Sequence, residues 1–153
     1  MSSIPQAVLL LHVLAALVYG AGYVGTNLLT EQARRTNSSE QRRYALDFSG
    51  VMDRLNVFGG TFAGITGIAA VFAVGHSIVA PWVLSSIVLY VLIVGTGIFY
   101  WGPIGRSIDG AMRAGDEARA AAILRSPRNI AVSRSENILF LALVTLMVLR
   151  PEF

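Results

Sequence analysis

Four long apolar stretches constrain this chain more than any other feature of its sequence. They cover about residues 5–29, 51–75, 81–101 and 130–149. Each reaches the roughly 20 residues that a helix needs to cross a bilayer core of about 30 Å. Because that core offers no water to the backbone, a helix that bonds its own peptide groups is expected for each stretch. The sequence therefore predicts an all-α, integral membrane four-helix bundle that forms a single membrane domain over residues 1–153.

The composition agrees with a membrane location and excludes several classes of protein. Apolar residues make up 54% of the chain and charged residues 14%, which excludes a domain with a water-facing surface. All twelve basic residues are arginine, and the net charge of only +3 gives no reason to expect a nucleic-acid partner. The chain contains no cysteine. Disulfides, thiolate metal sites and cysteine nucleophiles are thereby excluded.

The arginines are distributed unevenly among the connections, and this predicts the orientation. Eleven of the twelve lie in or beside the connections that follow the first and third spans. The connection at about residues 76–80 has none, and only Arg150 follows the fourth span. Because cytoplasmic loops of membrane proteins are rich in basic residues, we expect both termini outside and both long connections inside. The chain is thus predicted to be a multi-pass protein of a cytoplasmic (inner) membrane.

The two long connections carry local signals of their own. Asp116 and Glu117 precede an alanine-rich segment that ends shortly before Pro127. Acidic residues favour the start of a helix, alanine favours its interior, and proline commonly follows its end. We therefore predict a short cytoplasmic helix between the third and fourth spans. In the first connection, the Asn37-Ser38-Ser39 segment predicts a turn.

The first two spans each have one distinctive face. On the first span, polar and aromatic residues share a stripe that should face protein, among them His12, Tyr19, Tyr23 and Thr26. On the second span, small residues share a face that lets helices approach closely, among them Gly60, Gly64 and Gly67. We expect the tyrosine stripe to lie over the glycine face. The alternative is that the two faces line a ligand channel.

Charged and polar side chains gather at the predicted cytoplasmic edges of three spans. They carry both signs and comprise Glu31, Asp53, Arg54, Arg134, Glu136 and Asn137. Because an unpaired charge near the bilayer is costly, we expect ion pairs that hold the fourth span to the first two. A proton or ion relay is the alternative reading of the same residues.

The two histidines are the candidate cofactor ligands of the chain. His12 lies well inside the first span, and His76 lies at the end of the second, close to Trp82. The imidazole of His12 can bond a tyrosine hydroxyl or a backbone carbonyl, and the alternatives are that it binds haem or a metal or that it relays protons. With no cysteine, an ordinary transition-metal centre would need carboxylates or a second chain.

The order of several short motifs resembles one family of membrane proteins. They are Leu11-His12-Val13-Leu14-Ala15, the glycines at 20, 22 and 25, Thr66-Gly67, and Trp101-Gly102-Pro103 at the close of the third span. In this order of motifs the chain resembles the bacterial integral membrane family called domain of unknown function 2269, which implies a membrane location and no particular activity. It is also distantly similar to copper-resistance permease domains and haem-linked membrane oxidases, but it lacks their second buried histidine and methionine clusters.

The motifs of common enzymes cannot be assembled from this sequence. It contains no glycine-rich phosphate loop, no paired histidine-glutamate zinc motif and no serine-histidine-aspartate arrangement. We therefore expect a non-enzymatic integral membrane protein that works as a homodimer or as an accessory subunit of a larger complex. Its expected partners are the lipid bilayer and itself or other membrane subunits. The alternatives are a haem-binding or redox protein that uses His12, and a small transporter with glycine-broken helices.

Overall fold

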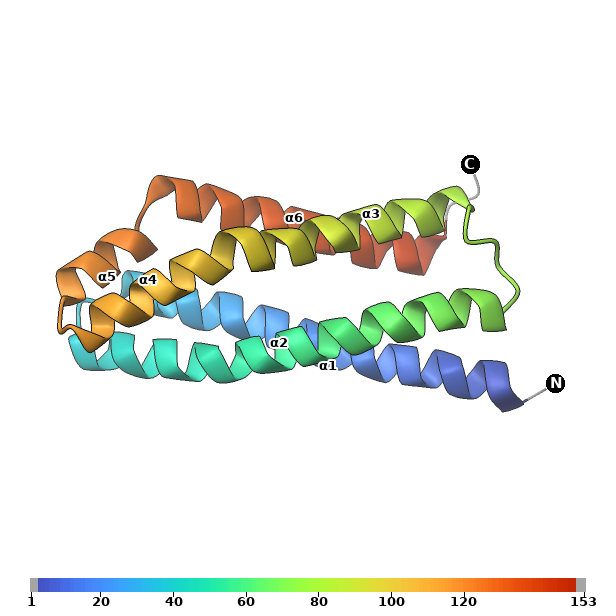
Figure 1. Ribbon diagram of the computed structural model, residues 1–153, viewed down its shortest axis with the longest axis horizontal. Helices are drawn as coiled ribbons and strands as arrows, with labels where there is room; N and C mark the ends of the chain where they lie inside the picture. The colour runs from blue at the N-terminus through green and yellow to red at the C-terminus, as the bar shows by residue number, and fades with distance from the viewer. Residues whose placement is uncertain (1–2, 151–153) are drawn as a thin grey trace. The chain divides into compact units, whose positions relative to one another are not determined.

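The computed structural model describes residues 3–150, and all the regular structure in that range is helical (Figure 1). The elements in chain order are α1 (Ser3–Arg35), α2 (Ser39–Ala73), α3 (Pro81–Thr96), the π-helical turn η1 (Gly97–Trp101), α4 (Gly102–Arg113), α5 (Glu117–Leu124) and α6 (Pro127–Leu149). Four stretches of helix are long and apolar enough to cross a membrane: α1, α2, the continuous run Pro81–Arg113, and α6. The predicted all-α fold with four spans is thus confirmed.

The backbone forms two compact units, residues 1–80 and 81–153, and each is described by itself. The first unit is the α1–α2 hairpin, whose helices run side by side in opposite directions (Figure 1). The turn between them lies at residues 36–38, as the sequence predicted to within a residue. Ser38 caps α2, because its hydroxyl oxygen accepts the backbone N–H of Gln41 at 3.3 Å.

Arg42 closes this hairpin at the turn. Its guanidinium is buried and donates to the carbonyl oxygens of Ala33 (3.4 Å) and Thr36 (2.9 Å) at the end of α1. The last carbonyls of a helix have no partner within the helix, and they carry the negative end of its dipole. A buried arginine at this place therefore donates hydrogen bonds to the free carbonyl oxygens and offsets the negative charge of the helix end.

We expect Arg42→Gln to destabilise the hairpin by about 1–3 kcal/mol, because two charged hydrogen bonds to buried carbonyls are lost. Arg43→Gln is the matched control, since Arg43 is the next residue and its side chain is exposed. The measurement is the thermal midpoint of the detergent-purified protein. Equal midpoints for the two variants would contradict this role of Arg42.

Two glycines let the backbones of α1 and α2 come close together. A methyl group added at Gly22 of α1 would lie 2.7 Å from the Cα of Asn56, and one added at Gly59 of α2 would lie 2.8 Å from the Cα of Tyr19. Both distances are shorter than real methyl contacts, so neither position can hold a side chain without moving the backbone. Each helix thus supplies one glycine to the closest contact of the hairpin.

The second unit contains α3, η1, α4, α5 and α6, and α3 packs against α6. The two helices are antiparallel, because Arg150 at the end of α6 lies over the ring of Trp82 at the start of α3, at 5.8 Å. The short helix predicted before the fourth span is confirmed as α5, which Asp116 caps by accepting the backbone N–H of Arg119 at 3.0 Å. The fourth helix begins at Pro127, three residues earlier than predicted.

The helix does not end at Trp101-Gly102-Pro103, where the sequence predicts the close of the third span. The helix continues to Arg113, and Pro103 stands in the first turn of α4. The residues just before it form a π-helical turn, in which the backbone N–H of Gly102 bonds the carbonyl oxygen of Gly97, five residues back. A proline lacks a backbone N–H and collides with the preceding turn of an α-helix. The wider π-turn accommodates this ring, so the helix does not break.

Candidate functional site

The π-turn directs two consecutive aromatic side chains toward the start of α6. The hydroxyl of Tyr100 donates to Oδ1 of Asn129 at 2.7 Å, and Nε1–H of Trp101 donates to Oε2 of Glu136 at 2.5 Å. The two rings meet edge to face, with their centroids 5.2 Å apart. Asn129 in turn donates to the carbonyl oxygen of Ile123 at 2.7 Å, which ties α6 to α5. Single π-turns within α-helices are frequent at functional sites, and here the turn builds a polar cluster.

Glu136 is the central residue of this cluster. Its side chain is 8% exposed, and the bond from Trp101 is its hydrogen bond within the described residues. Among the described residues of the second unit, 81–150, no arginine forms an ion pair with it. Asn129 lies seven residues before Glu136, Ser133 lies three residues before it, and Asn137 follows it directly. On a helix these four positions form one polar face of α6. A membrane-spanning helix therefore presents a buried carboxyl group on a polar face.

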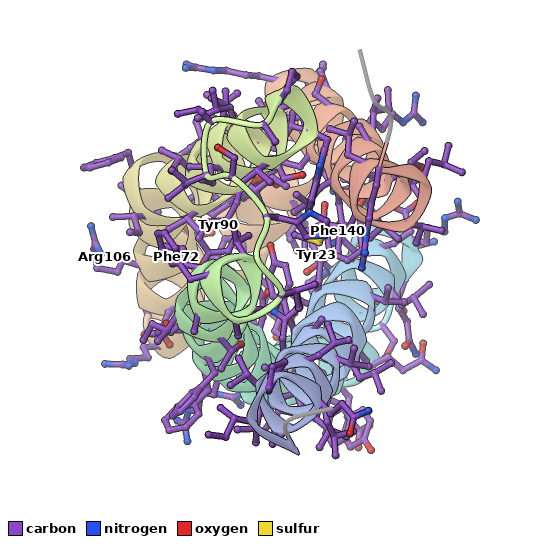
Figure 2. The ribbon with its side chains drawn as sticks, turned by 90° about the vertical axis from the view of Figure 1, so that its right-hand side faces the viewer. Tyr23, Phe72, Tyr90, Arg106 and Phe140 are labelled. Atoms are coloured by element: carbon purple, nitrogen blue, oxygen red, sulfur yellow. The ribbon has the colours of Figure 1, made fainter. Side chains whose placement is uncertain are left out.

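The other charged residues of the predicted ion-pair network lie elsewhere. Glu31 pairs within α1, with Arg34 and with Nε of Arg35 at 2.6 Å. Asp53, Arg54 and Arg134 have exposed side chains. Arg106, an exposed arginine of the second unit, points away from the helices (Figure 2). Glu31 thus pairs within its own helix, the indole of Trp101 bonds Glu136, and pairing across the helices stays a prediction.

His12 makes a hydrogen bond between the two helices of the first unit. Its Nδ1 lies 3.1 Å from the carbonyl oxygen of Ala63 and 3.4 Å from the hydroxyl of Thr66. Because a carbonyl oxygen only accepts, Nδ1 carries the proton, and the lone pair of the ring is on Nε2. A methyl group at Gly67 would lie 3.0 Å from Cε1 of this ring, so the absence of a side chain there makes room for the imidazole.

The structure does not bring His76 to the ring of His12. His76 is exposed in the turn after α2, whereas His12 contacts α2 at the level of Gly67. The helix between Gly67 and Ala73 alone rises about 9 Å at about 1.5 Å per residue. Among the described residues, no three histidine, aspartate or glutamate side chains gather in a way that could hold a metal ion. The two histidines of one chain are therefore not arranged as a pair of ligands.

The tyrosine stripe of α1 and the glycine face of α2 meet at one point. Tyr19 and Tyr23 are both 7% exposed, with ring centroids 6.3 Å apart, and a methyl group at Gly60 would lie 3.1 Å from the ring of Tyr19. Thr26 and Gly64 are half-buried. Within the described residues, the hydroxyl oxygen of Thr26 is buried without a hydrogen-bond partner.

Gly22 and Gly59, which lie at the closest contact, are not among the packing residues predicted from the sequence. The predicted face of α2 is centred on Gly60, Gly64 and Gly67, whereas the face that is actually buried is turned toward Gly59. The overlooked signal is a seam at alternating spacings of four and three residues along α2. Its members are mostly small: Ala45, Ser49, Met52, Asn56, Gly59, Ala63, Thr66 and Ala70. This spacing is typical of two helices that pack along their whole length.

These features define an α-helical integral membrane protein with four membrane-spanning stretches. The chain belongs to the family described as "Predicted integral membrane protein (DUF2269)", whose model matches residues 6–151. The family resemblance found in the sequence is thereby confirmed, whereas the distant similarity to copper-resistance permease and haem-linked families stays a prediction. No curated protein and no solved structure matches the chain.

Proposed function

We propose that this protein is not an enzyme, that it binds and releases a proton at Glu136, and that it acts as a small transporter that carries protons across the membrane. One observation carries the proposal. Glu136 is a carboxyl group, 8% exposed, within a membrane-spanning helix, and a single indole N–H bonds it. Ionisable groups inside membrane helices are costly and are commonly found on ion and proton pathways.

The chemistry of the cluster favours a proton over other ligands. An ionised carboxylate without a cation is expensive to bury, whereas a neutral carboxylic acid needs only hydrogen-bond partners. A proton is the smallest ligand that removes this cost. Trp101 can donate to Oε2 in both protonation states, so the indole holds the group in place while Oε1 gains and loses the proton.

Infrared spectroscopy tests proton binding directly. We expect the difference spectrum of the purified protein between acidic and alkaline pH to contain a C=O band from a protonated carboxyl group shielded from water. The band should be absent from Glu136→Gln and present in Glu40→Gln, because Glu40 is exposed on α2. A wild-type band that persists in Glu136→Gln would contradict the assignment to Glu136.

The assembly and the location that we propose come from the sequence. The small amount of chain outside the four spans supports a homodimer, or an accessory subunit of a larger membrane complex, as the working form. The arginine bias supports a multi-pass protein of the bacterial cytoplasmic membrane with both termini outside and α5 inside. The proposed partners are accordingly the lipid bilayer and a second copy or other membrane subunits.

Haem or metal binding by His12 is a second candidate function. The bond from Nδ1 to Ala63 leaves the lone pair on Nε2, and ligating histidines are commonly oriented by such a bond from the other ring nitrogen. If His12 binds haem, protein expressed with haem supplied has a Soret band that His12→Ala removes and His76→Ala keeps. A colourless wild-type protein without bound metal would exclude this function and leave His12 as an interhelical hydrogen-bond donor.

A further inference from the structure

A groove of about 630 Å³ runs along the second unit beside the π-turn. Val91, Leu92, Gly95, Thr96, Phe99, Tyr100, Arg128 and Val132 line it. Nearly all of this lining is apolar, and Arg128 is the charged residue in it. Gly95 opens the groove, because a methyl group added there would meet no atom within 4 Å. We propose that the groove binds one acyl chain of a phospholipid, whose anionic phosphate contacts Arg128.

The length and direction of the groove fit a lipid chain. The groove follows α3 and η1 from Tyr100 back to Val91, nine residues along a membrane-spanning helix. Nine residues of helix rise about 13 Å, and half of a bilayer core is about 15 Å. The groove thus extends along a spanning helix over nearly the depth of one leaflet.

The charge of the groove indicates which lipid binds. Arg128 stands at the start of α6, its guanidinium lies 5.3 Å from the centre of the Tyr100 ring, and the side chain is exposed. Stacking on the ring holds the guanidinium at one end of the groove, with donors left for a phosphate. Membrane leaflets that face the cytoplasm carry anionic lipids, and the arginine bias predicts that side for this end of α6. An anionic phospholipid is therefore the expected occupant.

Native mass spectrometry of the full chain in detergent tests the proposal, with phosphatidylglycerol and phosphatidylcholine of identical acyl chains as probes. We expect the wild type to bind phosphatidylglycerol about fivefold more tightly than phosphatidylcholine, the effect of one arginine at an anionic surface. Arg128→Gln should remove this preference, and Gly95→Phe should weaken the binding of both lipids. The controls are Arg119→Gln and Gly105→Phe, because Arg119 is exposed on α5 and Gly105 has open space on α4.

Three outcomes would overturn the proposal. The first is equal binding of the two lipids by the wild type, and the second is an unchanged preference in a folded Arg128→Gln variant. The third is a Gly95→Phe variant that binds both lipids as the wild type does; if the mass of the particle also changes, the groove holds a second copy of the chain. A thermal midpoint measured for each variant shows whether it is folded.

Discussion

Replacement of Gly59 by alanine should destabilise the protein, although alanine favours helices more than glycine does. The added methyl group would lie 2.8 Å from the Cα of Tyr19, so α1 and α2 must move apart along their closest contact. Overpacking of a close contact costs about 1–3 kcal/mol. We expect a thermal midpoint in detergent well below that of the wild type, and Gly59→Leu should prevent the hairpin from forming.

Gly50→Ala is the matched control within the same helix. A methyl group at Gly50 meets no atom within 4 Å, so only the change in helix propensity remains. That change favours alanine by about 0.5–1 kcal/mol in a helix interior. The two glycine-to-alanine variants of α2 should therefore shift the thermal midpoint in opposite directions. A Gly59→Ala variant at least as stable as Gly50→Ala would show that the two backbones are not in contact there.

The second large effect is expected at Trp101, which bonds the buried carboxyl group. Trp101→Phe removes the one N–H that donates to Glu136 and leaves a buried acceptor without a partner, at a cost of about 1–3 kcal/mol. Glu136→Gln should cost much less, because the amide oxygen of glutamine still accepts the indole N–H. We expect the thermal midpoint to fall more for Trp101→Phe than for Glu136→Gln. The reverse order would contradict the hydrogen bond as the main role of this indole.

The membrane spans could be predicted from the sequence because a long apolar run has few other physical outcomes. The continuation of the third helix through Gly102-Pro103 could not be predicted, because proline usually ends a helix and no pattern in the sequence indicates the π-turn. Without that turn, nothing in the sequence places Trp101 next to Glu136, which is 35 residues away. The sequence predicts ion pairs for Glu136, whereas the partner in the structure is the indole of Trp101.

The contact between the first two helices could be predicted from the sequence only in part. The tyrosine stripe and the small residues were both visible in the sequence, but a helical wheel with 3.6 residues per turn centred the face of α2 on Gly60 and Gly64. Two long helices that pack along their whole length follow a spacing closer to 3.5 residues, and the contact face drifts with respect to that wheel. The closest contact therefore falls on Gly59, one residue from the predicted position.

The central claim is that Glu136 carries protons through a membrane protein, and proton flux into liposomes tests it most directly. The purified protein is reconstituted with a pH-sensitive dye inside the liposomes, and a potassium diffusion potential drives proton entry. Liposomes with the wild type or with Glu40→Gln should acidify faster than empty liposomes, and those with Glu136→Gln should acidify no faster than empty ones. Equal rates for the wild type and Glu136→Gln would contradict the claim.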